Sequence, residues 1–172
     1  EAAASEQPAD VVATGDALYE DFNKDGRISP DDAQVIGNAQ PLLVGGLTNR
    51  VTWGNFDLSV FFQFMYGNKI LNFSNVTLLD NGANLENNQV RAALRRWQKP
   101  GDVTDVPRYE LGNTYNNFHS SRFLEDGSYL RLKNVAVGYN FPSRWLNKVN
   151  VRTARLYASA INLWTLTAYS GA

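Results

Sequence analysis

Two neighbouring stretches of the chain alternate apolar and polar residues with a period of two, which is the spacing of extended strands and not of helices. In residues 56–66 every even-numbered position is apolar, so one side of this stretch is an unbroken apolar face. Residues 42–53 show the same alternation with most apolar residues at odd positions. Gly54-Asn55 lies between them, and both residue types tolerate the positive φ of a tight turn. The sequence therefore predicts an antiparallel hairpin with one apolar face.

Two further strands are predicted at Tyr129–Phe141 and Val151–Thr165, joined by the short connector 143–150. In the first of them, apolar and small or polar residues alternate clearly over its second half. The sequence does not decide which residues of the last strand form its apolar face, because Leu156 and Tyr157 are neighbours and point to opposite sides.

A long region, residues 69–128, separates the second predicted strand from the third and is rich in Asn, Gly, Asp and Ser. It contains one predicted helix, Glu86–Gln98, which Pro100-Gly101 would end. Short turns that alternate with one very long loop are typical of outer-membrane β-barrels, whereas a compact soluble domain rarely holds such a loop. The predicted fold class is therefore all-β: an antiparallel transmembrane β-barrel segment with long extracellular loops.

Aromatic residues stand near both ends of the predicted strands. Trp53 and Phe56 flank the short turn, whereas Tyr66 and Tyr129 lie on the side of the long loop. Aromatic rings with a polar tip favour the headgroup levels of a bilayer, so these pairs predict two aromatic girdles. The alternative is a soluble β-sandwich whose aromatic residues fill a core.

Composition excludes several other classes. The formal net charge of the 172 residues is −1, without the basic surface that a nucleic-acid-binding protein needs, and there is no cysteine for a disulfide or a thiolate metal site. No stretch approaches the roughly 18 apolar residues of a transmembrane helix, but a barrel strand needs only about 9–11 residues. Residues 1–15 are predicted to be a flexible lead-in or part of an exposed loop. Their first residues do not resemble a signal peptide, so any export signal is expected outside this sequence.

Within the acidic segment 16–40, the twelve residues from Asp21 to Asp32 match the spacing of a calcium-binding loop. Oxygen-bearing side chains stand at loop positions 1, 3 and 5, Gly26 at position 6 permits the sharp turn, and position 7 supplies a backbone carbonyl. The predicted ligands are Asp21, Asn23, Asp25, Arg27 (through its carbonyl), Ser29 (through a water) and Asp32. A bound Ca²⁺ would stabilise the loop and would not act as a signal. The alternative is a set of Asx turns without a metal.

Six motifs occur in one order along the chain: Ile36–Pro41, Gly54–Gln63, Tyr66–Asn68, Arg96–Gly101, Val106–Arg108, and Arg122–Val135 followed by Gly138-Tyr139. Together with the calcium-like loop, this order resembles the C-terminal barrel segment of the SusC/RagA family of TonB-linked outer-membrane proteins. The resemblance covers roughly residues 16–171, and its most specific part is the block Arg122–Val135.

The resemblance implies a barrel of about 22 strands with an N-terminal plug, located in the outer membrane of Bacteroidota and in contact with lipid. It further implies uptake of oligosaccharides or peptides, a SusD-like surface lipoprotein as partner, energy supplied through TonB, and an extracellular position for the aspartate-rich loop. The plug and most strands are not in this sequence. Four strands cannot close a barrel, so transport is expected of a longer protein.

Residues that could carry enzyme chemistry are sparse. The sequence shows no nucleophile–base pattern, phosphate loop or zinc spacing. His119 is predicted to be an ordinary loop residue, and the basic residues of the predicted helix a solvated face. Acidic residues for glycan cleavage fall in the long loop with nothing to fix their separation: Asp105, Glu110, Glu125 and Asp126. The chain is therefore predicted not to be an enzyme. The competing function is a soluble, calcium-stabilised β-rich module that binds glycans or proteins.

Overall fold

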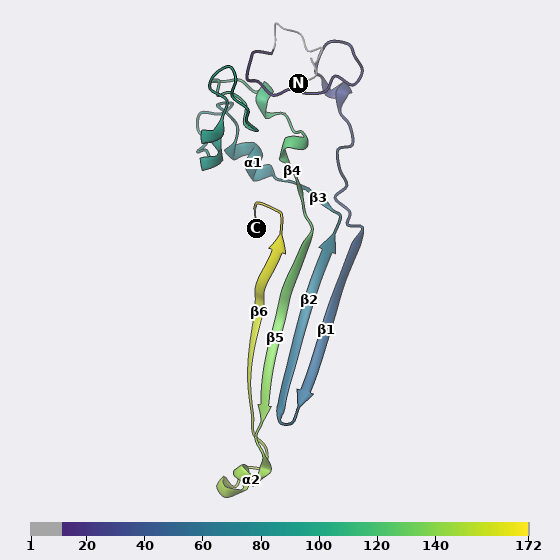
Figure 1. Cartoon of the computed structure of the whole chain (residues 1–172), viewed down its shortest axis with the longest axis vertical. Coiled ribbons are helices and arrows are strands. Elements are labelled where there is room, and N and C mark those ends of the chain that lie inside the picture. The colour runs from purple at the N-terminus through teal and green to yellow at the C-terminus, as the bar shows by residue number, and fades with distance from the viewer. Residues whose placement is uncertain (1–11, 172) are drawn as a thin grey trace. The chain divides into compact units, whose positions relative to one another are not determined.

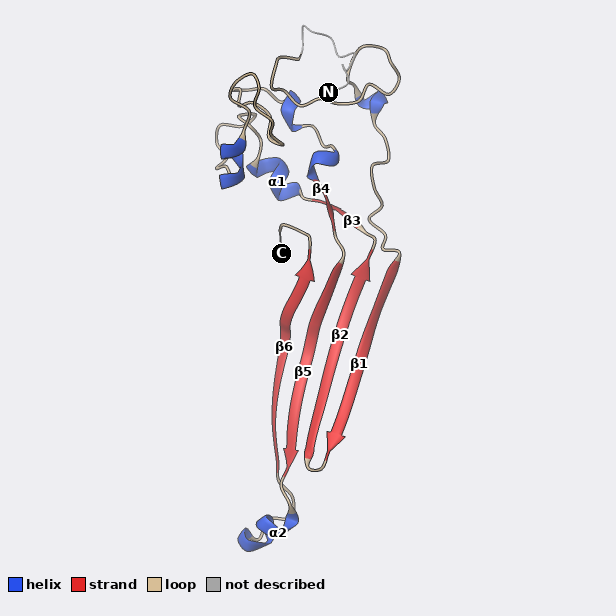
Figure 2. Ribbon diagram, in the orientation of Figure 1, coloured by secondary structure: helices blue, strands red, loops and turns tan. Residues whose placement is uncertain are grey.

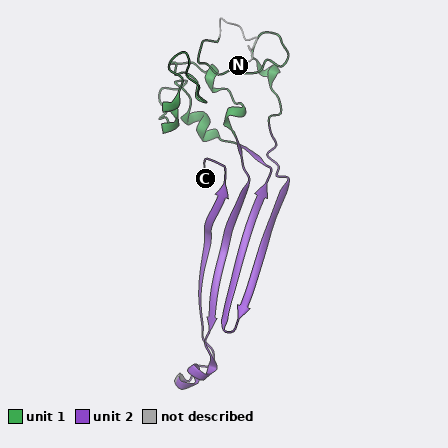
Figure 3. Cartoon of the chain, in the orientation of Figure 1, with its two compact units in different colours: residues 1–36, 71–124 green, residues 37–70, 125–172 purple. Residues whose placement is uncertain are grey.

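The computed structural model describes residues 12–171, except for the side chain of Val149. The chain divides into two compact units (Figure 3). The first contains the described residues up to Ile36 together with Leu71–Leu124, and the second contains Gly37–Ile70 together with the residues from Glu125 onwards. Most of the predicted lead-in, residues 1–11, lies outside the described residues.

The second unit contains a four-stranded antiparallel sheet with the order β1-β2-β5-β6 (Figure 1). All four strands predicted from the alternation are present. Their bounds are Leu43–Trp53 for β1, Phe56–Tyr66 for β2, Tyr129–Asn140 for β5 and Arg155–Thr167 for β6. The last strand starts four residues later than the predicted Val151, because the residues between β5 and β6 first form two short helical turns.

The strand register gathers the apolar residues on one face of this sheet. Phe56 lies opposite Trp53 of β1 and Tyr139 of β5, and Tyr139 in turn lies opposite Leu156 of β6. Tyr157 pairs with Gly138 and therefore belongs to the other face, which settles the open assignment in β6. The apolar face of the two central strands consists of Phe56, Leu58, Val60, Phe62, Phe64 and Tyr66 from β2, and Leu130, Leu132, Val135, Val137 and Tyr139 from β5.

An extra residue in β5 keeps this face continuous. The pairing of β2 with β5 skips Lys133, so that Phe61 lies opposite Asn134 while Phe62 lies opposite Leu132. A β-bulge of this kind changes which side the following residues occupy. Without it, Leu132 would fall on the face opposite Val135. The alternation in the sequence did not predict this bulge.

The predicted helix Glu86–Gln98 is wrong: the structure has only a short 3₁₀ turn there, η2 at Arg91–Arg95. The buried carboxylate of Asp80 explains the difference. It accepts hydrogen bonds from the backbone N–H groups of Gly82 and Asn84 and from the side-chain amides of Asn87 and Gln89. These bonds hold the start of the expected helix in a loop, because side chains of this kind compete with helical hydrogen bonding.

The remaining elements are short (Figure 2). The bounds are η1 at Pro30–Asp32, α1 at Phe73–Leu78, η3 at Tyr115–Asn117, η4 at Ser121–Phe123, α2 at Ser143–Leu146 and η5 at Asn147–Val149. Strands β3 (Lys69–Leu71) and β4 (Leu124–Asp126) pair in a small second sheet. Over residues 12–171, no helix has the length and apolar character that crossing a membrane requires.

The two units differ in where apolar side chains are buried. Among the described residues, the buried apolar side chains are Val76, Ala93, Val106 and Phe123 in the first unit and Leu146 in the connector of the second. None belongs to the four-stranded sheet. Instead, Leu47 is 61% exposed and Leu58 is 38% exposed on the apolar face. Within the second unit, the described elements leave this face exposed.

Candidate functional site

The aspartate-rich loop in the first unit is wound around the carboxylate of Asp21. Its Oδ1 accepts a hydrogen bond from the backbone N–H of Lys24 at 2.7 Å, and its Oδ2 accepts one from Gly26 at 2.7 Å. Lys24 and Gly26 both adopt positive φ angles, 60° and 78°. Glycine is the residue that takes this conformation without strain, which agrees with its predicted role at the sharp turn.

Asx turns continue the winding through the middle of the loop. Asn23 Oδ1 accepts from the N–H of Asp25 at 2.9 Å, and Asp25 Oδ1 accepts from the N–H of Arg27 at 2.8 Å. The Oγ of Ser29 accepts from the N–H of Asp31 at 3.1 Å and caps η1. All five residues therefore belong to one locally organised loop.

Asp32 closes the loop onto its start. Its Oδ1 accepts from the N–H groups of Phe22 and Asn23, at 3.0 and 3.3 Å, and its Oδ2 accepts from Ser29 at 2.8 Å. These backbone hydrogen bonds, that from Ser29 foremost, lower the pKa of Asp32, and a hydrogen bond with the Asp21 side chain acts in the same direction. The first and last predicted ligands thus lie within hydrogen-bonding reach of each other.

The oxygen atoms of the loop are of the kind that Ca²⁺ prefers. Over residues 12–171 there is no group of three or more His, Cys, Asp or Glu side chains placed to hold a metal. A calcium loop also uses amide and backbone carbonyl oxygens. A carboxylate oxygen that accepts one N–H keeps a second lone pair for a cation. The calcium site therefore stays a prediction.

A buried ion pair fixes the segment that leads into the loop. The side chain of Asp16 is fully buried and accepts from Arg108 Nε at 2.6 Å and from Asn116 Nδ2 at 2.8 Å. Burial alone would raise the pKa of Asp16, but the hydrogen bonds from Arg108, Asn116 and the N–H of Ala13 outweigh it and lower the pKa. Sequence reasoning missed this contact, because its partners lie far apart along the chain.

An aromatic cluster lies next to this ion pair. The ring of Tyr19 lies 5.2 Å from that of Tyr115 and 5.4 Å from that of Phe118, and its hydroxyl donates to the carbonyl of Tyr115 at 2.9 Å. Burial raises the pKa of Tyr115 to about 12. Aromatic pairs at such distances contribute roughly 0.5–1.5 kcal/mol each. The segment preceding the calcium-like loop is therefore held firmly against the second half of the long loop.

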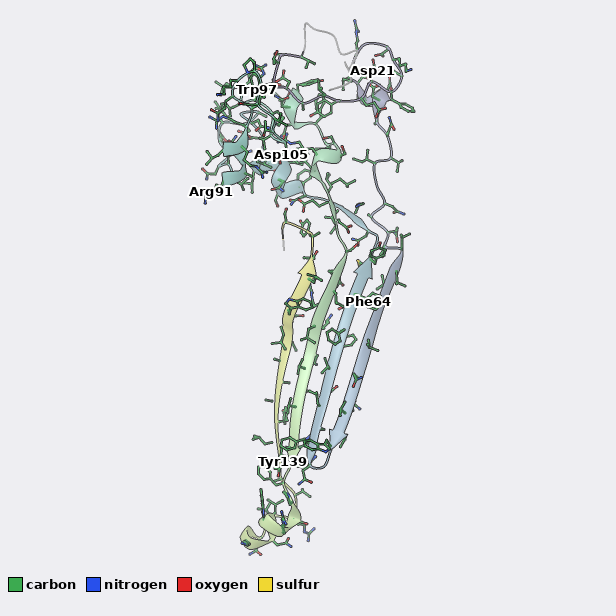
Figure 4. The ribbon with its side chains drawn as sticks, in the orientation of Figure 1. Asp21, Phe64, Arg91, Trp97, Asp105 and Tyr139 are labelled. Carbon is green, nitrogen blue, oxygen red and sulfur yellow. The ribbon has the colours of Figure 1, made fainter. Side chains whose placement is uncertain are left out.

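Between these two parts of the first unit lies an open cavity of about 980 Å³. Residues of the segments 15–36 and 97–122 line it, including Trp97, His119 and Asp105. Figure 4 labels Trp97 and Asp105. Trp97 packs directly on Gly15, where a Cβ would come within 2.3 Å of the indole ring. His119, predicted to be an ordinary loop residue, contacts the ring of Phe73 at 5.4 Å.

The two faces of the four-stranded sheet differ in their chemistry. On the polar face, Arg155 Nη2 donates to Asp57 Oδ2 at 2.6 Å, and the pair passes directly over Gly138. Lys133 donates to Gln63 on the same side at 2.9 Å. Hydrogen-bonded polar groups therefore occur on one face, whereas most of the large apolar side chains occupy the other.

Two adjacent glycines in β1 make room for rings on opposite faces. A Cβ on Gly45 would approach the ring of Phe64 to 2.5 Å on the apolar face, and a Cβ on Gly46 would approach the ring of Phe61 to 2.7 Å on the polar face. Phe61 breaks the polar pattern of β2 in the sequence, and its contact with Gly46 explains how the ring is accommodated.

The structure gathers the aromatic residues on one face at one end of the sheet but not at the other. Near the short turn, the rings of Phe56 and Tyr139 lie 4.6 Å apart on the apolar face, with Trp53 opposite Phe56. At the other end, Tyr66 lies on the apolar face, but Tyr129 pairs with Met65 and lies on the polar face. The prediction for Tyr129 was therefore wrong, because the bulge at Lys133 reverses the side of the residues before it.

Comparisons with known proteins agree with the features described above. No family model matches the chain. TonB-dependent receptor P3 of Formosa agariphila is 39% identical over 158 residues, which cover 92% of this chain and 15% of that protein. TonB-dependent receptor SusC of Bacteroides thetaiotaomicron is 24% identical over 90% of this chain and 15% of its own length.

Among solved structures, a chain of the RagAB peptide importer in its closed-closed state superposes with a TM-score of 0.72 and 27% identity, over 84% of this chain. This chain is homologous to the SusC/RagA-type TonB-dependent receptors. It covers only 16% of the matched RagAB chain and 15% of the receptors named above. The prediction that it is not an enzyme agrees with these relatives, which are named as receptors and an importer.

Proposed function

We propose that this chain forms part of the barrel wall of a SusC-like outer-membrane importer, with the apolar face of the sheet against lipid and the polar face towards the lumen. The observation that carries this proposal is the exposed, largely apolar face of four antiparallel strands. In a soluble calcium-stabilised module such a face would need a cover, and within residues 12–171 it has none.

The strand dimensions support the same conclusion. The four strands contain 11 to 13 residues. At roughly 3.3 Å per residue and a tilt of about 40°, such strands rise roughly 28–33 Å along the membrane normal, against an apolar band about 25 Å tall. The sheet is therefore long enough to cross the hydrocarbon layer and place its end residues at the headgroups.

The proposal extends to the whole protein and its partners, and the homologues support it. Four strands leave two edges without neighbours, so the chain would form one section of a closed barrel of about 22 strands. The whole protein would import oligosaccharides or peptides together with a SusD-like surface lipoprotein, driven through TonB. The names of its relatives, which are TonB-dependent receptors and a peptide importer, support this. The aspartate-rich loop and residues 69–128 would then face the outside, and the connections at 54–55 and 143–150 the periplasm.

Two adjacent residues of β2 provide the test. Leu58→Cys places a thiol on the apolar face, and Ser59→Cys places one on the polar face. In outer membranes that contain the full-length protein, a water-soluble maleimide is expected to label Ser59→Cys and to spare Leu58→Cys until detergent and denaturant are added. Equal labelling of both positions in intact membranes would refute the lipid contact.

We also propose that the loop from Asp21 to Asp32 binds one structural Ca²⁺. Asp21, Asn23, Asp25 and Asp32 would supply side-chain oxygens, Arg27 its carbonyl and Ser29 a bridging water. The approach of the Asp21 and Asp32 side chains supports this proposal, because it brings the residues at loop positions 1 and 12 together, as two ligands of one ion must lie. Adding EGTA should expose this loop to proteolysis in the full-length protein. Asp21→Asn should do so even with calcium present, and equal cleavage with and without calcium in the unsubstituted protein would refute the site.

A further inference from the structure

The last part of the chain carries an uneven distribution of charge. From Gly127 onwards the sequence contains no Asp or Glu, although it contains Arg131, Lys133, Arg144, Lys148, Arg152 and Arg155. Three of these basic residues, Arg144, Lys148 and Arg152, belong to the connector 141–154 between β5 and β6. The sequence around the connector therefore offers them no acidic neighbour.

The connector is an ordered platform. Its base is closed by a hydrogen bond from the N–H of Phe141 to the carbonyl of Ala154 at 3.0 Å. The helical turns α2 and η5 follow, and the N–H of Val151 donates back to the carbonyl of Leu146 at 3.2 Å. Leu146 is only 9% exposed and fills the interior of this turn. The backbone is thus fixed independently of the basic side chains.

The charged side chains project from this platform without acidic partners. Arg144, Lys148 and Arg152 are exposed, and over residues 12–171 none of them forms an ion pair. Trp145 lies beside them, is 50% exposed, and has the Arg144 guanidinium 5.9 Å from its ring. Arg155, in contrast, is already paired with Asp57.

The connector also borders a shallow cavity of about 750 Å³, whose lining includes Arg144, Arg152 and Arg155 but no acidic residue. The connector follows directly on the end of β5 (Figure 1). At that end, the rings of Tyr139 and Phe56 lie together on the apolar face. If that face contacts lipid, as proposed above, the platform stands at the level of the headgroups on the short-turn side of the membrane.

We propose that the connector 141–154 binds the headgroup of an anionic phospholipid, with Arg144, Lys148 and Arg152 against its phosphate and Trp145 in the interface. Basic side chains near a membrane surface attract anionic lipids, and Trp favours the boundary between headgroup and acyl chain. This proposal rests on the proposed function, since it needs a membrane on that side of the sheet.

The test compares two triple variants of the full-length protein in detergent micelles. Arg144→Gln/Lys148→Gln/Arg152→Gln removes the proposed contact, whereas Arg91→Gln/Arg96→Gln/Lys99→Gln removes three basic residues of the first unit that form no ion pair among the described residues. Both change the net charge equally. The readout is the dissociation constant of fluorescent phosphatidylglycerol relative to that of fluorescent phosphatidylcholine.

The unsubstituted protein and the control variant should bind phosphatidylglycerol at least about tenfold more tightly than phosphatidylcholine, and the connector variant should lose this preference. Equal loss in both variants would show a general charge effect and overturn the proposal. Displacement of the lipid by inorganic phosphate would indicate a free-anion site, and no preference in the unsubstituted protein would point to an acidic protein segment. Either result overturns lipid docking. The cysteine labelling at positions 58 and 59, repeated in the connector variant, separates failure of this proposal from failure of the barrel.

Discussion

A single arginine placed on either side of β1 distinguishes a lipid-facing sheet from a water-exposed one. Leu47 and Thr48 are adjacent in the middle of the strand, and both side chains are exposed. Leu47 lies opposite Phe62 on the apolar face, and Thr48 lies opposite Phe61 on the polar face. Neither substitution to Arg removes a buried side chain, so neither leaves a cavity in a core.

The two possible environments give different free energies of unfolding. If water covers both faces, Leu47→Arg and Thr48→Arg each change the free energy by no more than about 0.5 kcal/mol. If the apolar face contacts hydrocarbon, Leu47→Arg places a charge near the bilayer midplane and costs about 2–4 kcal/mol, whereas Thr48→Arg enters the aqueous lumen. We expect the second pattern.

The assay is reversible folding of the full-length protein into phosphatidylcholine vesicles, followed by tryptophan fluorescence as a function of guanidinium concentration. The midpoint should fall for Leu47→Arg and stay close to that of the unsubstituted protein for Thr48→Arg. A difference between the two variants smaller than about 0.5 kcal/mol contradicts the assignment of the faces.

Three further predictions concern local contacts. Asp16→Asn should cost about 2 kcal/mol, measured as increased protease cleavage of the first unit, because it removes a buried charge-assisted contact with Arg108. Folding lowers the pKa of Asp16, so the contribution of this carboxylate to stability is complete above its unfolded pKa of about 3.9 and is lost as pH falls through the lower folded value. Asp16→Asn should abolish this dependence of stability on pH. An unchanged acid unfolding profile in the variant would contradict the assignment. Gly45→Ala should destabilise the barrel by about 1–3 kcal/mol in vesicle refolding, because the Cβ meets the Phe64 ring, and a neutral result would show that the ring moves freely. Because Gly26 has φ +78°, Gly26→Ala should introduce about 1–2 kcal/mol of backbone strain. Titration calorimetry should therefore show weaker calcium binding, and an unchanged calcium affinity would contradict this prediction.

The strands could be predicted because their signal is local. A period of two and the Gly54-Asn55 turn are both visible in the sequence, and together they place β1 and β2 within a residue of their observed bounds. The winding of the aspartate-rich loop is local as well, since Asp21 and Asp25 bond to backbone groups a few residues away.

The remaining features depend on partners that local patterns do not reveal. The contact of Asp16 with Arg108 joins residues 92 positions apart. The expected helix at Glu86–Gln98 does not form, because the side-chain amides of Asn87 and Gln89 donate hydrogen bonds to Asp80, which lies outside the predicted segment. The side on which Tyr129 lies depends on one unpaired residue in β5, and periodicity cannot predict such an insertion within a strand.

The bulge at Lys133 makes β5 sensitive to deletion in a way that substitution does not reproduce. Replacing Lys133 removes its bond to Gln63 but leaves the count of residues intact. Deleting it, without compensation elsewhere, would shift Tyr129 to Leu132 by one position, so that Arg131 would turn to the apolar face and Leu132 to the polar face. Homologous strands should therefore vary in residue type at this point while keeping their length, and an alignment that opens a gap there would assign every residue before the gap to the wrong face of the sheet.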